Sequence, residues 1–99
     1  MLVDAMLVSF AQRVSVPADV LFRELEGESV ILHLESESYF GLDHVGTRMW
    51  QLLTESESIQ TAYEALLEEY EVEPERLRAD LTTLLETLSD RGLVDIRGG

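Results

Sequence analysis

The chain has 99 residues, of which 45% are hydrophobic, and carries seven arginines, no lysine, no cysteine and a formal net charge of −13. This length and composition are typical of one small globular domain. The lack of cysteine excludes disulfide bonds, thiolate zinc sites and cysteine nucleophiles. Nucleic acids and anionic lipids repel so acidic a surface, because binding to either depends on cations. We therefore expect a neutral or basic partner, or an acidic surface that serves solubility alone.

Residues 1–16 are predicted to form a loosely tethered lead-in that is partly extended. This segment is apolar, but it contains Asp4 and does not begin with basic residues, so it does not resemble a secretion signal. No stretch of the chain has the roughly 20 apolar residues that a membrane span needs. We expect a cytoplasmic protein.

Three short strands are predicted next, at residues 20–25, 30–34 and 39–42. They are rich in β-branched and aromatic residues and are separated by short polar segments. Gly27 lies between the first two strands and can adopt a positive φ, which suits a tight hairpin. The pattern therefore predicts a three-stranded antiparallel meander.

Two amphipathic helices are predicted after the strands, at residues 44–53 and 59–70. Asp43 and Ser58 stand at their N-cap positions. Apolar residues recur at helical spacing in both. Trp50 falls on the apolar face of the first helix, where we interpret it as a core anchor.

A third helix is predicted from Pro74, which suits a first turn, to residue 90, before a C-terminal Gly92. It has more leucine than one contact surface needs. Four leucines lie within about 60° of one another at 100° per residue, and Leu85 lies to one side of this stripe, next to Arg78. The stripe consists of Leu77, Leu81, Leu84 and Leu88.

Strands followed by helices predict an α+β fold with three helices on one face of a small sheet. The short strands and three short helices suggest a winged-helix-like arrangement. We expect one domain over residues 1–99, in which residues 97–99 are a frayed tail.

The sequence offers no pattern that predicts catalysis, a metal or a cofactor. His33 and His44 stand outside any metal-binding motif, and no convergent ligand set is visible. The many carboxylates follow solvent-facing helix positions, whereas acid–base catalysis needs one placed in a pocket. No GxSxG motif or glycine-rich phosphate loop is present.

The third strand, which we take as residues 38–42, has no lysine or proline to guard it if it lies at the edge of the sheet. Its backbone groups could then bind an extended peptide by strand addition. The alternative is that the third helix covers this edge completely. The pattern does not decide between these two interpretations.

Residues 14–96 resemble the PqqD-like family, also called the RiPP recognition element. The resemblance rests on VPADVLFRELEGESVILHLESESYFGLDHVGTRMWQLL, then TAYEALLEEYEV, then LRADLTTLLETLSDRGLV. Its landmarks are the hairpin before YFGLD, the VGTRMWQLL helix, and the leucine-rich third helix that closes with RGLV.

The resemblance implies a non-catalytic protein without cofactors that binds the leader region of a ribosomally made precursor peptide. The implied partner enzymes are a leader peptidase and a cyclase in lasso-peptide assembly, or a radical SAM enzyme in quinone-cofactor assembly, and we favour a lasso-like cluster. The leader would join the third strand beside the third helix. The implied peptide-binding residues are Ser38, Tyr39, Phe40, Gly41, Leu42, Leu77, Arg78, Leu81 and Leu85.

Two other classes of function remain as alternatives. A winged-helix DNA-binding regulator would share the fold, but the charge of −13 opposes it. A small enzyme is the other, and no site for one is found. A homodimer formed by strand pairing or exchange would also follow from an exposed strand edge.

Overall fold

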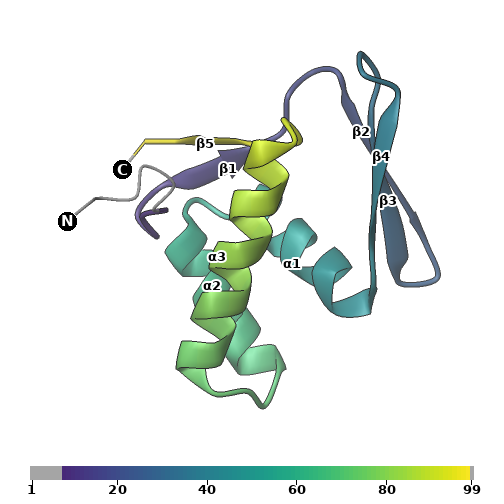
Figure 1. Ribbon diagram of the computed structural model, residues 1–99. Helices are drawn as coiled ribbons and strands as arrows, with labels where there is room; N and C mark the ends of the chain where they lie inside the picture. The colour runs from purple at the N-terminus through teal and green to yellow at the C-terminus, as the bar shows by residue number, and fades with distance from the viewer. Residues whose placement is uncertain (1–7, 99) are drawn as a thin grey trace.

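The strands form two separate antiparallel sheets in the computed structural model, which describes residues 8–98 (Figure 1). The larger sheet has the order β2 (Val20–Leu25), β3 (Glu28–His33), β4 (Ser38–Leu42). The smaller sheet pairs β1 (Arg13–Ser15) with β5 (Asp95–Arg97). The predicted meander is confirmed, and the second sheet is an addition to it.

The hairpin between β2 and β3 follows from its two turn residues. Glu26 and Gly27 have φ values of 55° and 86°, which is the pattern of a two-residue type I′ turn. A side chain at Gly27 would also meet the ring of His44, because a Cβ built there lies 2.5 Å from the ring carbon Cδ2. The turn thus needs glycine for its backbone conformation, whereas the exposed ring of His44 could move aside for a side chain.

The helices lie between the two sheets (Figure 1), and the first two are capped at their N-termini as predicted. They are α1 (His44–Glu55), α2 (Ile59–Glu69) and α3 (Pro74–Asp90). The Asp43 carboxylate accepts a hydrogen bond from the backbone N–H of Gly46 at 2.8 Å, and Ser58 Oγ accepts one from Thr61 at 3.1 Å. The predicted α+β class is confirmed.

The segment before β2 is more firmly held than predicted. Residues 1–7 lie outside the described residues, but Phe10 and Val14 are buried in the hydrophobic core. Val14 pairs with Ile96 in the small sheet, so β5 extends through Arg97 rather than fraying there. The expected loose lead-in and frayed tail are therefore wrong for residues 8–16 and 97.

The segment before β2 also provides hydrogen-bond acceptors for the first turn of α2. The carbonyl oxygens of Gln12 and Phe10 accept hydrogen bonds from the backbone N–H groups of Ile59 and Gln60, each at 2.8 Å. The first N–H groups of a helix have no partner within the helix itself. Segments far apart in sequence therefore satisfy each other's hydrogen bonds.

One hydrophobic core joins the larger sheet to the helices. Ile31 on the central strand is fully buried, and the ring of Phe22 stacks on that of Trp50 with centroids 5.5 Å apart. The expectation that Trp50 anchors the core is confirmed, since only 3% of it is exposed. On α3 the buried residues are Leu77, Leu81, Leu85 and Leu88.

Candidate functional site

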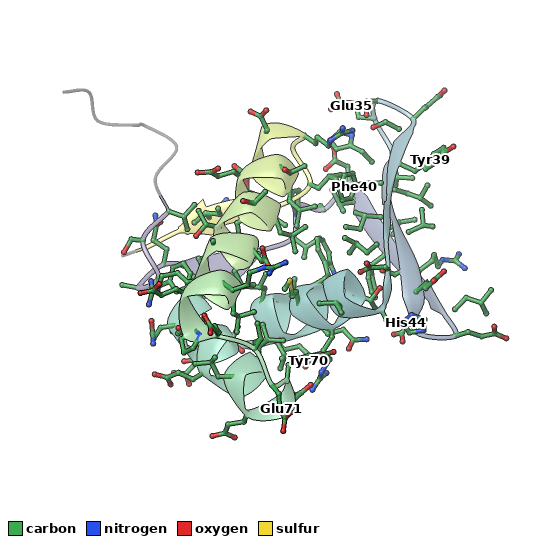
Figure 2. The ribbon with its side chains drawn as sticks, turned by 60° about the horizontal axis from the view of Figure 1, so that its bottom comes forward. Glu35, Tyr39, Phe40, His44, Tyr70 and Glu71 are labelled. Atoms are coloured by element: carbon green, nitrogen blue, oxygen red, sulfur yellow. The ribbon has the colours of Figure 1, made fainter. Side chains whose placement is uncertain are left out.

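Strand β4 lies at an edge of the larger sheet. It pairs with β3 on one side and has no strand partner on the other side among residues 8–98. Its side chains alternate between the two faces of the sheet. Tyr39 points away from the helices, whereas Phe40 points toward them (Figure 2). The free side of β4 can therefore pair with an added strand whose side chains also reach both faces.

A surface groove of about 490 Å³ lies beside this edge. It is bounded by β4, by the first turns of α1 and by one side of α3. Its lining is mostly apolar, with Asp80 on the α3 side. The residues whose side chains line this groove include Phe40, Leu42, Val45, Met49, Asp80 and Leu84. The third helix thus stands beside the edge of β4 and leaves it open.

A buried hydroxyl pair fixes α1 against the sheet. Thr47 Oγ1 lies 2.7 Å from Ser29 Oγ on β3, and it donates a hydrogen bond of 3.4 Å to the carbonyl oxygen of Leu42. Both hydroxyl side chains belong to buried residues, so each would cost free energy without a partner. This link holds the wall of the groove on α1 at a set position relative to β4.

The charged residues that line the groove are both acidic. Asp43 contributes from the junction of β4 and α1, and Asp80 from α3. Outside the lining, the guanidinium of Arg91, at the end of α3, lies 5.1 Å from the ring centroid of Phe40. A cation over an aromatic face is favourable. An occupant would therefore meet negative charge in the groove, with a cation nearby at Phe40.

A salt bridge between Arg48 and Glu69 links α1 to α2. Arg48 Nη2 lies 2.6 Å from Glu69 Oε2, and Arg48 Nε also donates to this carboxylate. The hydrogen bond from Arg48 lowers the pKa of Glu69, and the same bond raises the pKa of Arg48. Neither residue lines the groove. The pair is best explained as a support for helix packing.

The structure separates the predicted binding residues into two groups. Residues 38–42 form β4, and Phe40, Gly41 and Leu42 line the groove. Leu77, Leu81 and Leu85 are instead buried in the core, with exposed fractions of 3%, 0% and 0%. Such side chains have no surface to offer a peptide, so the expectation that they form the groove wall is wrong.

Arg78 lies on another side of α3. Its guanidinium carbon is 4.2 Å from the ring centroid of Phe10 and 4.9 Å from that of Tyr63. These rings belong to the N-terminal segment and to α2, not to the sheet. The structure therefore does not bring Arg78 together with β4.

Leu84 and Val45 line the groove, and neither is among the predicted peptide-binding residues. Leu84 is half-buried and Val45 is exposed. Leu84 and Leu85 both flank the line through Leu81 and Leu88, so helical periodicity cannot tell which of them faces the core. We find no signal in the sequence that separates them.

Two further observations concern the described residues as a whole. Within residues 8–98, no three His, Asp or Glu side chains are grouped so that they could hold a metal ion. None of the helices in that range combines the length and hydrophobicity needed to cross a bilayer.

Comparisons with known proteins agree on one family. Residues 28–94 match the family model described as coenzyme PQQ synthesis protein D (PqqD). The structure of TbiB1 in complex with the TbiA(beta) leader peptide matches at 32% identity with a TM-score of 0.78, over 86% of this chain and 99% of that chain. Lasso peptide synthetase B1 complexed with its leader peptide matches at 22% identity with a TM-score of 0.76, over 84% and 98%, which supports the fold alone. A search of curated proteins gave no match.

Proposed function

Because this chain belongs to the PqqD family, we propose that it binds the leader region of a ribosomally synthesised precursor peptide and presents it to a modifying enzyme. The observation that carries this proposal is the unpaired edge of β4 next to an apolar groove. The leader pairs its backbone with β4 and becomes the fourth strand of the sheet. Residues Ser38–Leu42 supply this edge.

The groove gives the interaction its affinity. Alternate residues of an added strand point to the same face, so every second leader side chain faces the groove. Apolar side chains there bury against Phe40, Met49 and Leu84. A few buried anchors carry most of the energy of an interface. The acidic residues of the lining, Asp43 and Asp80, favour a basic leader residue beside them, which mainly speeds association.

The structural neighbours support a leader peptide as the ligand. TbiB1, which shares 32% identity with this chain, was solved with a leader peptide. We assign this chain to a lasso-type precursor, with a leader peptidase and a cyclase as partner enzymes, ahead of a radical SAM enzyme. The chain itself is assigned no catalytic role, and it works in the cytoplasm, where ribosomes supply the precursor. A DNA-binding role has no support from the matches, and the charge of −13 opposes it.

Calorimetry with a synthetic leader tests the proposal. The leader is the N-terminal part of a precursor peptide identified from the reading frames that neighbour the gene for this chain. We expect Leu84→Asp to weaken its binding at least tenfold, about 1.4 kcal/mol, because a charge would replace an apolar wall next to Asp80. Circular dichroism and thermal unfolding should show that the variant remains folded, because Leu84 is not a fully buried residue.

The matched control is Thr83→Asp, which adds the same charge to the exposed neighbouring residue. We expect its leader affinity to stay within about twofold of the unaltered protein, since charges at exposed positions interact weakly. Equal leader binding by Leu84→Asp, Thr83→Asp and the unaltered protein would refute the groove assignment. Failure of the unaltered protein to bind the leader would refute the proposed function.

The free edge also provides for self-association. If two copies pair through β4, a dimer and the leader compete for the same backbone groups. Sedimentation of the unaltered protein should then show a dimer that the leader dissociates.

A further inference from the structure

The outer face of the larger sheet is apolar and uncovered. It carries five of the eight exposed large hydrophobic side chains of the described residues: Leu21, Leu25, Val30, Leu34 and Tyr39. The strand register explains why they gather. Leu21, Leu32 and Tyr39 lie side by side across β2, β3 and β4. Val30 is two residues before Leu32 and therefore lies on the same face. Tyr39 shows this orientation, away from every helix (Figure 2).

This arrangement departs from the usual pattern of an antiparallel sheet. Such a sheet commonly packs one face on a core and exposes a polar face to water. Here the inner face contributes Phe22, Ile31 and Phe40 to the core, while the outer face is also largely apolar. Exposed apolar patches of this kind mark interaction sites.

A hollow of about 790 Å³ lies at the end of the sheet where β2 turns into β3. Leu25, Val30 and Gly41 line it from the outer face, together with the charged residues Arg23, Glu24, Glu28 and Asp43. An apolar side chain with a basic neighbour fits this lining. Gly41 supplies no side chain to fill it, and a Cβ built there would have no heavy atom within 4 Å. A flat sheet surface thus has a recess next to the edge strand.

The charges around this face select its occupant. The turn at one end contains Glu26 and borders Glu28, and the turn at the other end contains Glu35 and Glu37. If two copies stacked in the aligned geometry of packed sheets, glutamates would meet glutamates in either direction. The four glutamates outnumber Arg23, the one arginine of strands β2, β3 and β4, so a second copy is disfavoured, and a partner with basic residues around an apolar patch fits.

Resting on the function proposed above, we propose that this outer face is the docking surface for the enzyme that acts on the bound precursor. The enzyme presents apolar side chains, one of which fills the hollow beside Gly41, flanked by arginine or lysine. A leader added to β4 would place its own outward side chains next to Tyr39 and so enlarge this surface. The enzyme therefore binds the leader-loaded protein more tightly than the free protein.

A double variant on β2 tests this inference away from the leader groove. Leu21→Ser with Leu25→Ser removes apolar surface from the outer face, and neither residue lines the groove. Leader affinity is measured by calorimetry, and affinity for the modifying enzyme encoded beside this chain by biolayer interferometry with saturating precursor. We expect leader affinity within about twofold of the unaltered protein and enzyme affinity at least tenfold weaker. Leu25→Ser alone, at a residue that is 78% exposed, serves if the double variant does not fold.

Two matched controls separate this face from the rest of the surface. Tyr70→Ser removes an exposed aromatic side chain at the end of α2, far from Tyr39 (Figure 2). Glu35→Lys should weaken enzyme binding severalfold, whereas Glu71→Lys, beside Tyr70, should not, because only the first lies at the rim of the face.

Each outcome is decisive. Unchanged enzyme affinity in the β2 variants would overturn the inference while leaving leader binding intact. A dimer of the unaltered protein that these variants convert to monomer would also overturn it, because the face would then belong to a second copy. Loss of leader binding by the unaltered protein would count against the proposed function instead.

Discussion

The two sides of α3 differ in what they pack against. Leu85 is fully buried in the core, whereas its neighbour Leu84 is only half-buried and lines the groove beside β4. Each side also has an arginine over an aromatic ring: Arg78 over Phe10 and Arg91 over Phe40. The comparison teaches that the leucines of α3 spread over a wide sector because one helix contributes to two surfaces, the core and the wall of the groove beside β4.

Truncating the two leucines should reveal the largest difference between the two sides of α3, in the free energy of unfolding. Leu85→Ala leaves a cavity in a closed core and should cost about 2–5 kcal/mol. Leu84→Ala should cost about 1 kcal/mol, because less apolar surface leaves contact. Urea unfolding measures the free energy of unfolding of both variants. Similar losses in the two would show that the two sides of α3 contribute equally to stability.

Replacing the two arginines should show a smaller difference between the two sides of α3, in the affinity for the leader. Arg91→Gln removes the cation above Phe40, a contact worth about 0.5–1 kcal/mol, and should weaken leader binding two- to fivefold. Arg78→Gln removes the equivalent contact on the other side and should leave leader affinity unchanged. Calorimetry with the synthetic leader measures both, and a reversed order would contradict the assignment of the two sides.

Glu69→Gln should have the smallest effect, and only on the stability of the helices. Arg48 lowers the pKa of Glu69 in the folded protein. Ionised Glu69 therefore stabilises the fold fully at pH values above its pKa in the unfolded chain, which is near 4.5. This contribution is lost as the pH falls through the lower pKa that Glu69 has in the folded protein. Because the pair is partly exposed, the expected change in Tm is small.

Thermal unfolding from neutral to acidic pH measures this effect. Glu69→Gln should have a slightly lower Tm at neutral pH and a shallower fall on acidification. Glu68→Gln removes the same charge from the neighbouring residue without breaking the contact to Arg48, and it should follow the unaltered protein. Leader affinity should be the same in all three proteins.

Most secondary structure could be predicted because its signals are local. A glycine turn, two polar N-caps and a proline at a first helical turn locate the hairpin and the helix starts within a few residues of sequence. The pairing of β1 with β5 could not be predicted in this way. Each of these strands has three residues, and each is stabilised by a partner at the far end of the chain.

The site could be predicted only in part for a similar reason. The edge strand follows from the order of three hairpin-connected strands. The wall of the groove depends on the rotation of α3 about its axis, which is set by contacts with other elements. Leu84 and Leu85 are chemically identical and lie on opposite sides of the line through Leu81 and Leu88, so the choice between them needs the tertiary structure.

The pairing of Val14 with Ile96 has a consequence for the order of folding. The meander of β2, β3 and β4 joins neighbouring segments, whereas β1 and β5 must close nearly the whole described chain into a loop. Loop closure costs more entropy as the loop lengthens, and contacts distant in sequence slow folding. On a ribosome, the edge strand β4 can therefore pair with β3 while β5 is still inside the exit tunnel, and the small sheet closes last.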